Sequence, residues 1–402
     1  VWLPGGEVWL SPRTDKTFLV KFGGNVKENW TDDGLTVEQT DCEEVEAVPY
    51  DMMVSGADSK GVSVLRVWRS RDIDTFDMNS FSSGDYARAT LANNKAELIS
   101  KVLYPRDSHY EGKELRLKQQ YFLVSASAQN IVADHMKYYP SLDNFADKVA
   151  IHINDTHPAM IVPELMRIFM DDYHYSWDDA FNIIRKTLAY TNHTVLAEAL
   201  EKWPMSYLEK VVPVLVPIIK ELNNRIRKNN PDPVIQIIDD ENKVHMAHID
   251  IHYGFSTNGV AAIHTDILKD SELSHFYKLY PERFNNKTNG ISYRRWIESC
   301  NPELSKLLDD SIGKSWRHNP LDLAKLNDFK DDSNMLDRIE RVKNINKENF
   351  SNFVKQKYNF DIDPKSIYDV QIKRIHEYKR QLLNALNILL LYHRILREPD
   401  FK

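Results

Sequence analysis

The sequence contains few cysteines and few glycines. Its 402 residues include only two cysteines, Cys42 and Cys300, and 13 glycines. Two widely separated cysteines argue against a disulfide framework and against a cysteine-ligated zinc site, and they are typical of a reducing compartment. The glycines form neither a P-loop nor a Gly-x-Gly-x-x-Gly motif, so two common nucleotide-binding signatures are missing.

A long apolar run and an excess of positive charge are also missing. The apolar stretch Ile388–Tyr392 is far shorter than the about 20 residues that a membrane helix needs, and no longer one stands out. The formal net charge of −7 provides no electrostatic reason to bind nucleic acid. No charged-then-apolar leader is seen, so we expect no signal peptide and a cytoplasmic protein, with Val1 a cut edge rather than a natural terminus.

The remaining composition is that of a globular α/β protein. Hydrophobic residues make up 42% of the chain and charged residues 28%, and the length suggests two or three domains of roughly 150 residues. β-Formers dominate up to about Thr90, and helical periodicity follows, with strand–polar turn–helix units that favour a parallel sheet. We predict strands at Thr17–Phe22, Val62–Trp68, Lys148–Ile153 and Ile367–Ile372, and helices at Ala92–Val102, Lys113–His135, Ala159–Met170, Trp177–Lys186, Leu208–Ile226, Arg294–Cys300, Asp332–Tyr358 and His376–Leu396.

A polar segment at Phe284–Ile291 indicates a domain boundary. We therefore predict one domain over residues 1–285 and a second, incomplete one over residues 286–402. The second domain contains the strand and helix of one βα unit, and a sheet needs several strands to be stable.

The densest chemical signal is the basic segment Lys373–Arg380, where the last predicted strand gives way to a helix. Ligands of α/β sheets gather at the carboxyl ends of strands, and a helix N-terminus with Lys and Arg side chains suits a phosphate. A phosphate site and an ordinary solvated helix start are about equally plausible from this pattern alone.

Three polar segments also follow predicted strands or the domain break: Asn154–Pro158, Tyr190–Thr194 and Lys287–Gly290. Their side chains could bind a sugar or an anion, although a helix cap, a turn or a polar linker is the better explanation of each segment by itself. His245, His248 and His252 could share a helix face, but no carboxylate completes a zinc motif, so we predict no metal site.

Taken together, six segments resemble the α-glucan phosphorylases, the family of glycogen, starch and maltodextrin phosphorylases. They occur in the family's order at near-family spacing: Ile99–Pro105, Glu111–Gln119, Asn154–Ala159, Tyr190–Leu196, Asn286–Ile291 and Lys373–Leu383. The resemblance implies a two-domain fold of the GT-B type with an active site in the cleft. It also implies retaining, reversible phosphorolysis of α-1,4-glucan by orthophosphate to glucose 1-phosphate, with pyridoxal 5'-phosphate as cofactor, in a cytoplasmic homodimer.

The resemblance assigns substrate contacts residue by residue. Arg374 and Lys379 are expected to hold the substrate phosphate. His193 is expected to offer its backbone carbonyl and ring to the glucosyl unit, with Asn192 beside it. Asn289 is expected to bond a sugar hydroxyl.

Further positions are implied around the approach to the site. Asp155 and His157 are expected to line the path of glucan and phosphate. The loop Arg106–His109, with Asp107, corresponds to the family's mobile gate. It departs from the animal pattern, which has asparagines around the aspartate, and this leaves the contacts of the gate open.

The cofactor assignments are incomplete within this sequence. Lys373 is expected beside the cofactor phosphate and Trp296 near the cofactor. The family's glycine-rich loop is expected before Val1 and its cofactor lysine beyond Lys402. Since the aldehyde cofactor is held covalently by that lysine, we expect this chain alone to be inactive.

Two other readings remain open. A nucleotide-sugar glycosyltransferase with the GT-B architecture would use the basic segment for a diphosphate, but it should lack the six collinear segments. A fragment that binds glucan without turnover is the non-enzymatic alternative.

Overall fold

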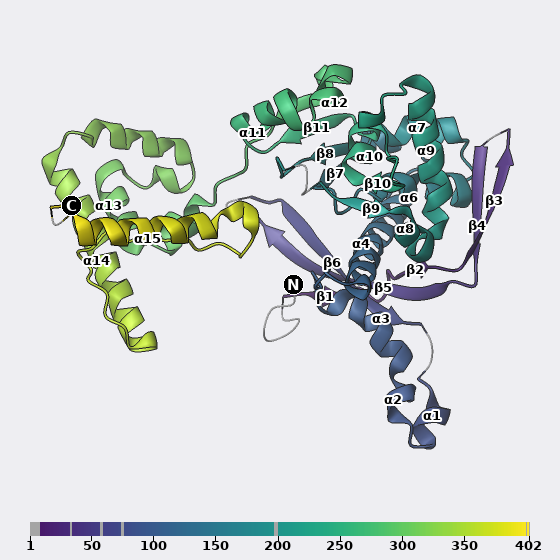
Figure 1. Ribbon diagram of the computed structural model, residues 1–402, viewed down its shortest axis with the longest axis horizontal. Coiled ribbons are helices and arrows are strands. Elements are labelled where there is room, and N and C mark those ends of the chain that lie inside the picture. Colours follow the sequence, from purple (N-terminus) through teal and green to yellow (C-terminus); the bar gives the residue numbers. More distant parts are fainter. Residues whose placement is uncertain are drawn as a thin grey trace. The chain divides into compact units, whose positions relative to one another are not determined.

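The computed structural model describes residues 9–32, 34–56, 59–73, 76–196, 200–398 and 400–401. Both ends named above, Val1 and Lys402, lie outside these residues. The chain forms two compact units, an N-terminal unit over Val1–Asn289 and a C-terminal unit over Gly290–Lys402 (Figure 1). Each unit is described by itself.

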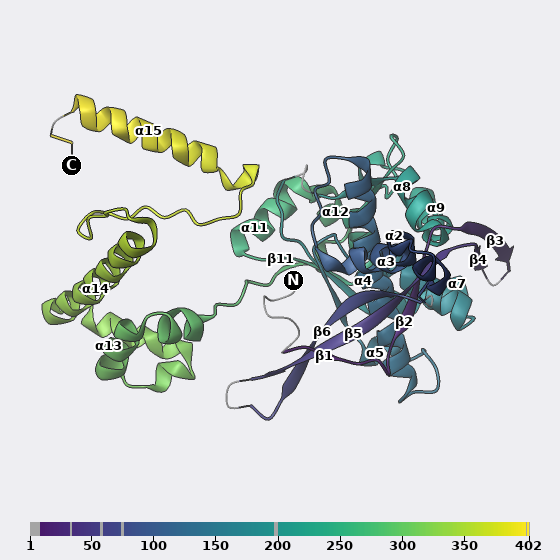
Figure 2. The same cartoon turned by 90° about the horizontal axis from the view of Figure 1, so that it is seen from below.

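The N-terminal unit begins with antiparallel strands, as the β-forming sequence predicts. β5 pairs with β1, β2 and β6 in one sheet, and β3 and β4 form a hairpin (Figure 2). The bounds are β1 Ser11–Pro12, β2 Phe18–Phe22, β3 Asn25–Thr31, β4 Gly34–Thr40, β5 Glu43–Ser55 and β6 Val62–Asp72. The predicted strands at residues 17–22 and 62–68 are confirmed.

The predicted extent of this β-rich part is wrong at its end. Two short helices, α1 (Met78–Ser82) and α2 (Tyr86–Ala89), precede the expected change near residue 92. Each is capped by an aspartate: Asp77 accepts from the backbone N–H of Ser80, and Asp85 from that of Arg88. A side-chain cap can start a helix that has no apolar periodicity. The spacing of apolar residues therefore did not predict α1 and α2.

A four-stranded parallel sheet forms the second part of the N-terminal unit. Its strand order is β12-β11-β8-β7, with bounds β7 Ile151–Asn154, β8 Leu188–Thr191, β11 Ser256–Gly259 and β12 Phe284–Asn286. The strand predicted at residues 148–153 is present as β7, and β8 is the strand expected before the end of the polar segment Tyr190–Thr194. The segment at 284–291 differs from the expectation of a polar break, because its first three residues pair with β11 as β12.

Helices pack around the two sheets of the N-terminal unit in Figure 1, with α3 against β6 of the antiparallel sheet. Their bounds are α3 Leu91–Lys101, α4 Tyr110–Met136, α5 Phe145–Lys148, α6 Ile161–Arg167, α7 Trp177–Ile184, α8 Met205–Val211, α9 Val216–Asn229, α10 Met246–Tyr253, α11 Ala262–Ile267 and α12 Ser274–Leu279, with β9 (Lys202–Pro204) and β10 (Lys243–His245) as a small antiparallel pair. The single helix predicted over 208–226 is instead divided into α8, a 3₁₀ turn at Pro213–Leu215 and α9. Pro213 lacks the N–H that a continuous helix requires.

A buried polar network fixes α6 against α4. The Glu164 carboxylate is fully buried and accepts hydrogen bonds from Tyr121 at 3.0 Å and Ser125 at 2.7 Å. The Arg167 guanidinium donates to both of its oxygens at 3.0 and 3.1 Å. Because a buried carboxylate needs this compensation, the network holds α6 in one position behind the parallel sheet.

The C-terminal unit is mostly helical. It contains α13 (Pro302–Ile312), α14 (Ser333–Tyr358), α15 (Gln381–Arg397) and a π-helical turn at Arg294–Ser299. A small core of Leu307, Met335 and Val342 joins α13 and α14. The helices predicted at 294–300 and 332–358 are confirmed, the first as the π-helical turn and the second as α14.

The predicted final βα unit is only partly present. The stretch 367–372 is not a strand, and Ile367 and Ile372 are 97% and 90% exposed. Since strand backbone must pair, and no strand of the C-terminal unit occurs in the described chain, residues 367–372 have nothing to pair with. The last helix begins at Gln381, five residues later than predicted, because Arg380 adopts φ +57° in the left-handed region.

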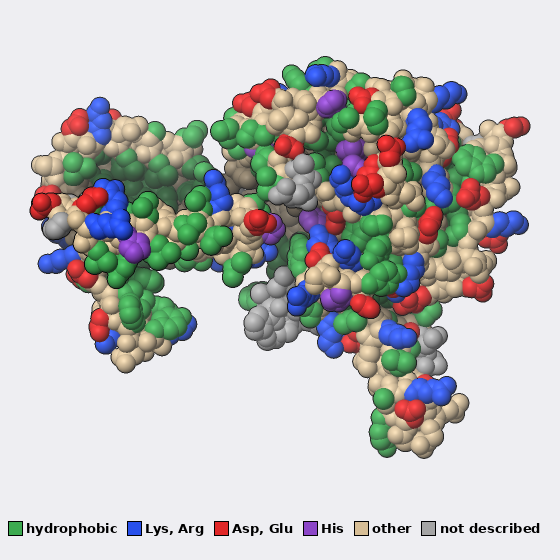
Figure 3. Space-filling view, viewed as in Figure 1, with side chains coloured by type: hydrophobic (Ala, Val, Ile, Leu, Met, Phe, Trp, Pro, Cys, Tyr) green, Lys and Arg blue, Asp and Glu red, His purple; other side chains and the backbone are tan. Residues whose placement is uncertain are grey.

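Helix α15 presents its apolar side chains to solvent. None of its residues is buried, and hydrophobic atoms appear in green along it in Figure 3. Figure 2 separates it from α13 and α14, which it overlaps in Figure 1. Within the described ranges, no helix combines the length and apolar composition that a bilayer crossing requires.

Candidate substrate-binding site

Five of the predicted site residues lie at one edge of the parallel sheet. Asp155 and His157 follow β7, Asn192 and His193 follow β8, and Asn289 follows β12. The registers Asn154↔Thr191 and Gly259↔Asn286 align the ends of neighbouring strands. All four strands are parallel, so these segments leave the sheet at the same carboxyl edge, where ligands of such sheets bind.

The segment after β8 is held by hydrogen bonds across the edge. The backbone N–H of Asn192 donates to the carbonyl of Asn258 at 2.9 Å, and its buried side chain donates to the Tyr190 hydroxyl at 3.1 Å. The exposed His193 ring lies 2.5 Å from the Asn154 amide oxygen through Nε2. Asn192 therefore fixes the backbone of this segment. His193 is exposed and uses only Nε2, so its other ring nitrogen is available to a ligand.

The segment after β7 has an unusual backbone. Asp155 adopts φ +65°, and its carboxylate accepts a hydrogen bond from the Thr156 backbone N–H at 2.7 Å. An aspartate tolerates the left-handed region better than most residues because it bonds locally in this way. His157 is half-buried and packs edge-on against Tyr104, with ring centroids 6.5 Å apart.

The loop after β12 is anchored to β11. Lys287 donates through its backbone N–H to the Gly259 carbonyl at 3.1 Å, and Asn289 donates to the Val260 carbonyl at 3.2 Å. The Asn289 side chain is exposed and has no hydrogen-bond partner among the described residues. Its amide is thus positioned by the backbone and available for binding.

The predicted gate loop is tied to α4. Asp107 pairs with Arg116 at 3.0 Å, and Arg116 also pairs with Glu201 at 3.2 Å. The loop and helix approach so closely that a Cβ on Gly112 would lie 1.8 Å from the carbonyl oxygen of Arg106, so only glycine fits there. Asp107 forms this ion pair, and within the described ranges no hydrogen bond or ion pair joins it to the sheet edge.

Asp250 is a neighbour of this edge that the sequence did not reveal. It is fully buried in α10, and neither carboxylate oxygen has a hydrogen-bond partner among the residues that the structure describes. Burial, and then the negative charge of Asp155, raise the pKa of Asp250 well above its usual value. The mostly apolar sequence of α10 gives no indication that a buried carboxyl without a partner lies close to Asp155.

The predicted phosphate residues lie in the C-terminal unit. Lys373 and Lys379 line a hollow of about 860 Å³ together with Tyr378 and Arg380. Arg374 does not line it; its carbonyl accepts a hydrogen bond from Gln381, and its side chain is exposed. The hollow is cationic, and its lysines have no carboxylate partner in the part of the chain that is described.

Trp296 is in the same unit. It is 62% exposed, and the Arg295 guanidinium lies 5.3 Å from its ring. Among the described residues no contact joins Trp296 to Lys373, so the structure does not bring together the two residues assigned to the cofactor.

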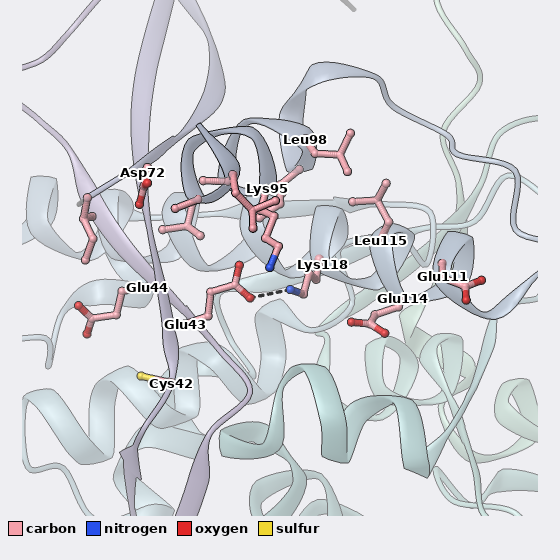
Figure 4. A pocket seen from close by; sticks show the side chains of 16 residues that line it. Cys42, Glu43, Glu44, Asp72, Lys95, Leu98, Glu111, Glu114, Leu115 and Lys118 are labelled. Atoms are coloured by element: carbon pink, nitrogen blue, oxygen red, sulfur yellow. Dashed lines mark hydrogen bonds and ion pairs between the residues drawn. The ribbon is translucent and has the colours of Figure 1, made fainter. Parts of the chain in front are cut away.

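A further pocket lies away from all of these residues. It has a volume of about 760 Å³ between β5, β6, α3 and α4, and Lys118 pairs with Glu43 at 2.7 Å within it (Figure 4). Glu44, Asp72 and Glu111 add negative charge. No predicted site residue lines it, so it does not belong to the candidate site.

The three histidines set aside as a metal site are hydrogen-bonded; His248 and His252 are buried, and His245 is half-buried beside Asp239. His248 bonds the Gln236 carbonyl at 2.6 Å, and His252 bonds the Tyr280 hydroxyl at 2.9 Å and the Ile235 carbonyl at 2.8 Å. Burial lowers the pKa of His248 to about 3 and that of His252 to about 4, so both are neutral at pH 7. Among the described residues no group of three or more potential ligands could hold a metal ion.

The sequence is similar to those of several known phosphorylases. The sequence is similar to the glycogen phosphorylase of Pasteurella multocida, with 41% identity over 410 residues, covering 99% of this chain and 50% of that protein. It is 43% identical over 384 residues to the maltodextrin phosphorylase of Streptococcus pneumoniae, covering 95% of this chain and 48% of that protein. It is also 43% identical over 417 residues to the liver glycogen phosphorylase of Bos taurus, covering 99% and 48%.

The chain thus spans about half the length of the curated relatives it matches. The carbohydrate phosphorylase family matches residues 1–402, the whole sequence. The similarity therefore includes the sheet edge, the gate loop and the basic segment alike. This chain belongs to the carbohydrate phosphorylase family.

Proposed function

We propose that the protein acts as an α-glucan phosphorylase, which splits α-1,4-glucan with orthophosphate to release glucose 1-phosphate, reversibly and with retention of configuration. The observation that carries the proposal is the sheet edge, where His193 and Asn289 remain exposed on segments anchored to neighbouring strands. Family membership over residues 1–402 and the names of the relatives support the substrate class.

The sheet edge provides the sugar contacts in this proposal. His193 bonds the glucosyl unit through its backbone carbonyl and ring, and Asn289 bonds a sugar hydroxyl. Asp155 and His157 line the approach, and Asn192 holds the His193 segment through its buried contacts. Fixed polar groups of this kind orient a sugar ring before reaction.

The basic segment provides the phosphate contacts. Arg374 grips two phosphate oxygens with its guanidinium, and Lys379 adds a point charge. In the reaction the bond from the sugar C1 to the glycosidic oxygen breaks, that oxygen gains a proton, and C1 forms a bond to a phosphate oxygen on the same face. Positive side chains beside the phosphate stabilise the charge that develops on it.

Pyridoxal 5'-phosphate is proposed as the cofactor from the family. The cationic hollow at Lys373 and Lys379 has the donor chemistry of a phosphate site, so the residues present fit the phosphate end of that group. When bound, the cofactor supplies a phosphate that exchanges a proton with the substrate phosphate. Lys373 is the residue we assign to that phosphate, and Trp296 to the cofactor's surroundings.

A GT-B architecture, with domains near residues 1–285 and 286–402, a homodimeric assembly and a cytoplasmic location belong to the same proposal. They rest on the family, and the mixed α/β fold with its parallel sheet is compatible with them.

The test is an assay of the full-length gene product with maltodextrin and orthophosphate. We expect glucose 1-phosphate release, and we expect Arg374→Gln to reduce it at least about a hundredfold, because a charged phosphate contact is removed. Arg397→Gln, the same charge change in α15, is the matched control and should leave the rate unchanged. Sugar transfer from a nucleotide sugar without orthophosphate would favour the glycosyltransferase reading instead, and glucan binding without turnover would favour the non-enzymatic one.

A further inference from the structure

The first turn of α11 bonds to the two segments that carry the proposed sugar contacts. The helix begins at Ala262, shortly after β11 ends at Gly259 (Figure 1). Its half-buried His264 and its buried Thr265 both form hydrogen bonds with residues at the carboxyl edge of the parallel sheet. Neither residue is a predicted sugar contact, yet both are tied to the backbone from which those contacts project.

His264 forms hydrogen bonds through both of its ring nitrogens. Nδ1 accepts from the backbone N–H of Val260 at 3.0 Å, and Nε2 lies 3.4 Å from the carbonyl oxygen of Thr194. Because Nδ1 is an acceptor, the ring proton of the neutral imidazole is on Nε2, which can donate to that carbonyl. A single tautomer therefore satisfies both contacts.

Both contacts of His264 lead directly to a proposed sugar contact. The carbonyl of Val260 accepts from the backbone N–H of Asn289 at 3.2 Å, so Val260 bonds to the His264 ring and to the Asn289 backbone at once. Thr194 directly follows His193 in the sequence. The His264 ring thus joins the His193 segment to the backbone that holds Asn289.

The same turn is fitted closely to the ends of β11 and β12. The Thr265 hydroxyl lies 2.9 Å from the Ala261 carbonyl and 3.1 Å from the amide oxygen of Asn286. A Cβ on Gly259 would lie 2.4 Å from Oγ1 of Thr265 and 2.8 Å from Nδ1 of His264, so this approach requires glycine. The close fit limits the positions that the His264 ring can take.

We propose that His264 is a positioning residue for the glucosyl unit, which fixes the spacing between His193 and Asn289 and acts through them. The inference rests on the proposed function, because it concerns the sugar contacts of that site. A sugar bound there contacts both segments, so a fixed spacing prepares the site before binding. A misplacement of about 1 Å in such contacts can cost on the order of a hundredfold in rate.

The test is steady-state kinetics of the full-length gene product, with maltodextrin and orthophosphate varied in turn. His264→Ala removes both contacts, so we expect the KM for maltodextrin to rise at least about fivefold and kcat/KM for maltodextrin to fall at least about tenfold. The KM for orthophosphate should be unchanged, because the proposed phosphate residues belong to the C-terminal unit. A merely structural role would lower kcat through loss of active enzyme and leave both KM values unchanged.

Two conservative variants separate the two contacts. In His264→Asn the amide oxygen can replace Nδ1 and accept from Val260, whereas in His264→Gln the amide nitrogen can replace Nε2 and donate to Thr194. Each should recover part of the loss that His264→Ala shows. His275→Ala removes an exposed histidine of α12 that pairs with Asp232, and as the matched control it should leave both KM values unchanged.

Amide hydrogen exchange distinguishes failure of this inference from failure of the proposed function. In His264→Ala the Val260 amide loses its acceptor, so its exchange should accelerate at least about tenfold. If the unmodified protein releases glucose 1-phosphate and His264→Ala has the same KM for maltodextrin, the inference is overturned and the proposed function stands. If the unmodified protein releases none, the proposed function fails, and an unchanged exchange rate at Val260 would overturn the anchoring role of His264 as well.

Discussion

Helices α6 and α15 are both rich in apolar residues, but they have opposite environments. In α6, six of seven residues are buried, including Leu165 at 0% exposure. In α15, no residue is buried, and Leu389 is 54% exposed. The difference shows that apolar composition predicts a helix, whereas burial depends on the elements that surround it: α6 has α4, α7 and α9 as neighbours.

The first prediction tests the burial of α6 by removing the polar network around Glu164. Glu164→Ala leaves the largely buried Arg167 charge with only the more exposed Asp172 carboxylate, 3.6 Å away, so we expect a loss of about 3–5 kcal/mol in the free energy of unfolding. Chemical denaturation of the chain measures it. Tyr121→Phe, which removes one hydrogen bond to the same carboxylate, should cost about 1 kcal/mol. Equal and small losses in both variants would contradict a single buried network.

The second prediction concerns the packing of α6. Leu165→Ala creates a cavity in the core, and we expect a loss of about 2–5 kcal/mol in the free energy of unfolding. Urea denaturation checks it. A loss below 1 kcal/mol would mean that the core around α6 is not packed as described.

The third prediction concerns pH, and it also applies to the N-terminal unit. A buried neutral histidine binds no proton in the native state above its lowered pKa, while the unfolded state binds one below about pH 6.5. Stability is therefore present above pH 6.5 and is lost as the pH falls towards the folded pKa of His252, about 4. At pH 5 this one residue should cost about 2 kcal/mol relative to pH 7.

The variant His252→Gln isolates this contribution. The difference in unfolding free energy between pH 7 and pH 5 should shrink by about 2 kcal/mol relative to the unmodified chain. An unchanged difference would show that folding does not lower the pKa of His252.

The smallest expected effect concerns α15, the exposed helix of the pair. Leu389→Ala in α15 removes an exposed side chain, so we expect a change below about 0.5 kcal/mol in stability. Amide hydrogen exchange should also be fast throughout α15 and slow in α6. Slow exchange in α15 would show that its apolar face is covered in solution.

Much of the N-terminal unit could be predicted from its sequence. Residues 151–154 and 188–191 are short apolar runs ended by polar side chains, which predicts buried strands and places Asp155 and His193 at their carboxyl ends. Parallel pairing then brings these residues to one edge. The turn residues alone could not show which of them anchor the backbone, as Asn192 does, and which stay exposed, as Asn289 does.

Other features depend on contacts that no local pattern encodes. Asp250 lies within a helix whose other residues are mostly apolar, and only the fold places it near Asp155. The stretch 367–372 has β-forming residues, but a strand exists only where another strand pairs with it. His264 and Thr194 are far apart in sequence and meet only through the packing of α11 beside the segment after β8.

The most direct measurement is orthophosphate-dependent release of glucose 1-phosphate from maltodextrin by the full-length gene product, made with Arg374→Gln beside Arg397→Gln. The account predicts release that depends on orthophosphate, nearly abolished in the first variant and preserved in the second. Equal rates in the two variants would contradict the assignment of Arg374 to the substrate phosphate. No release under any condition would contradict the proposed reaction itself.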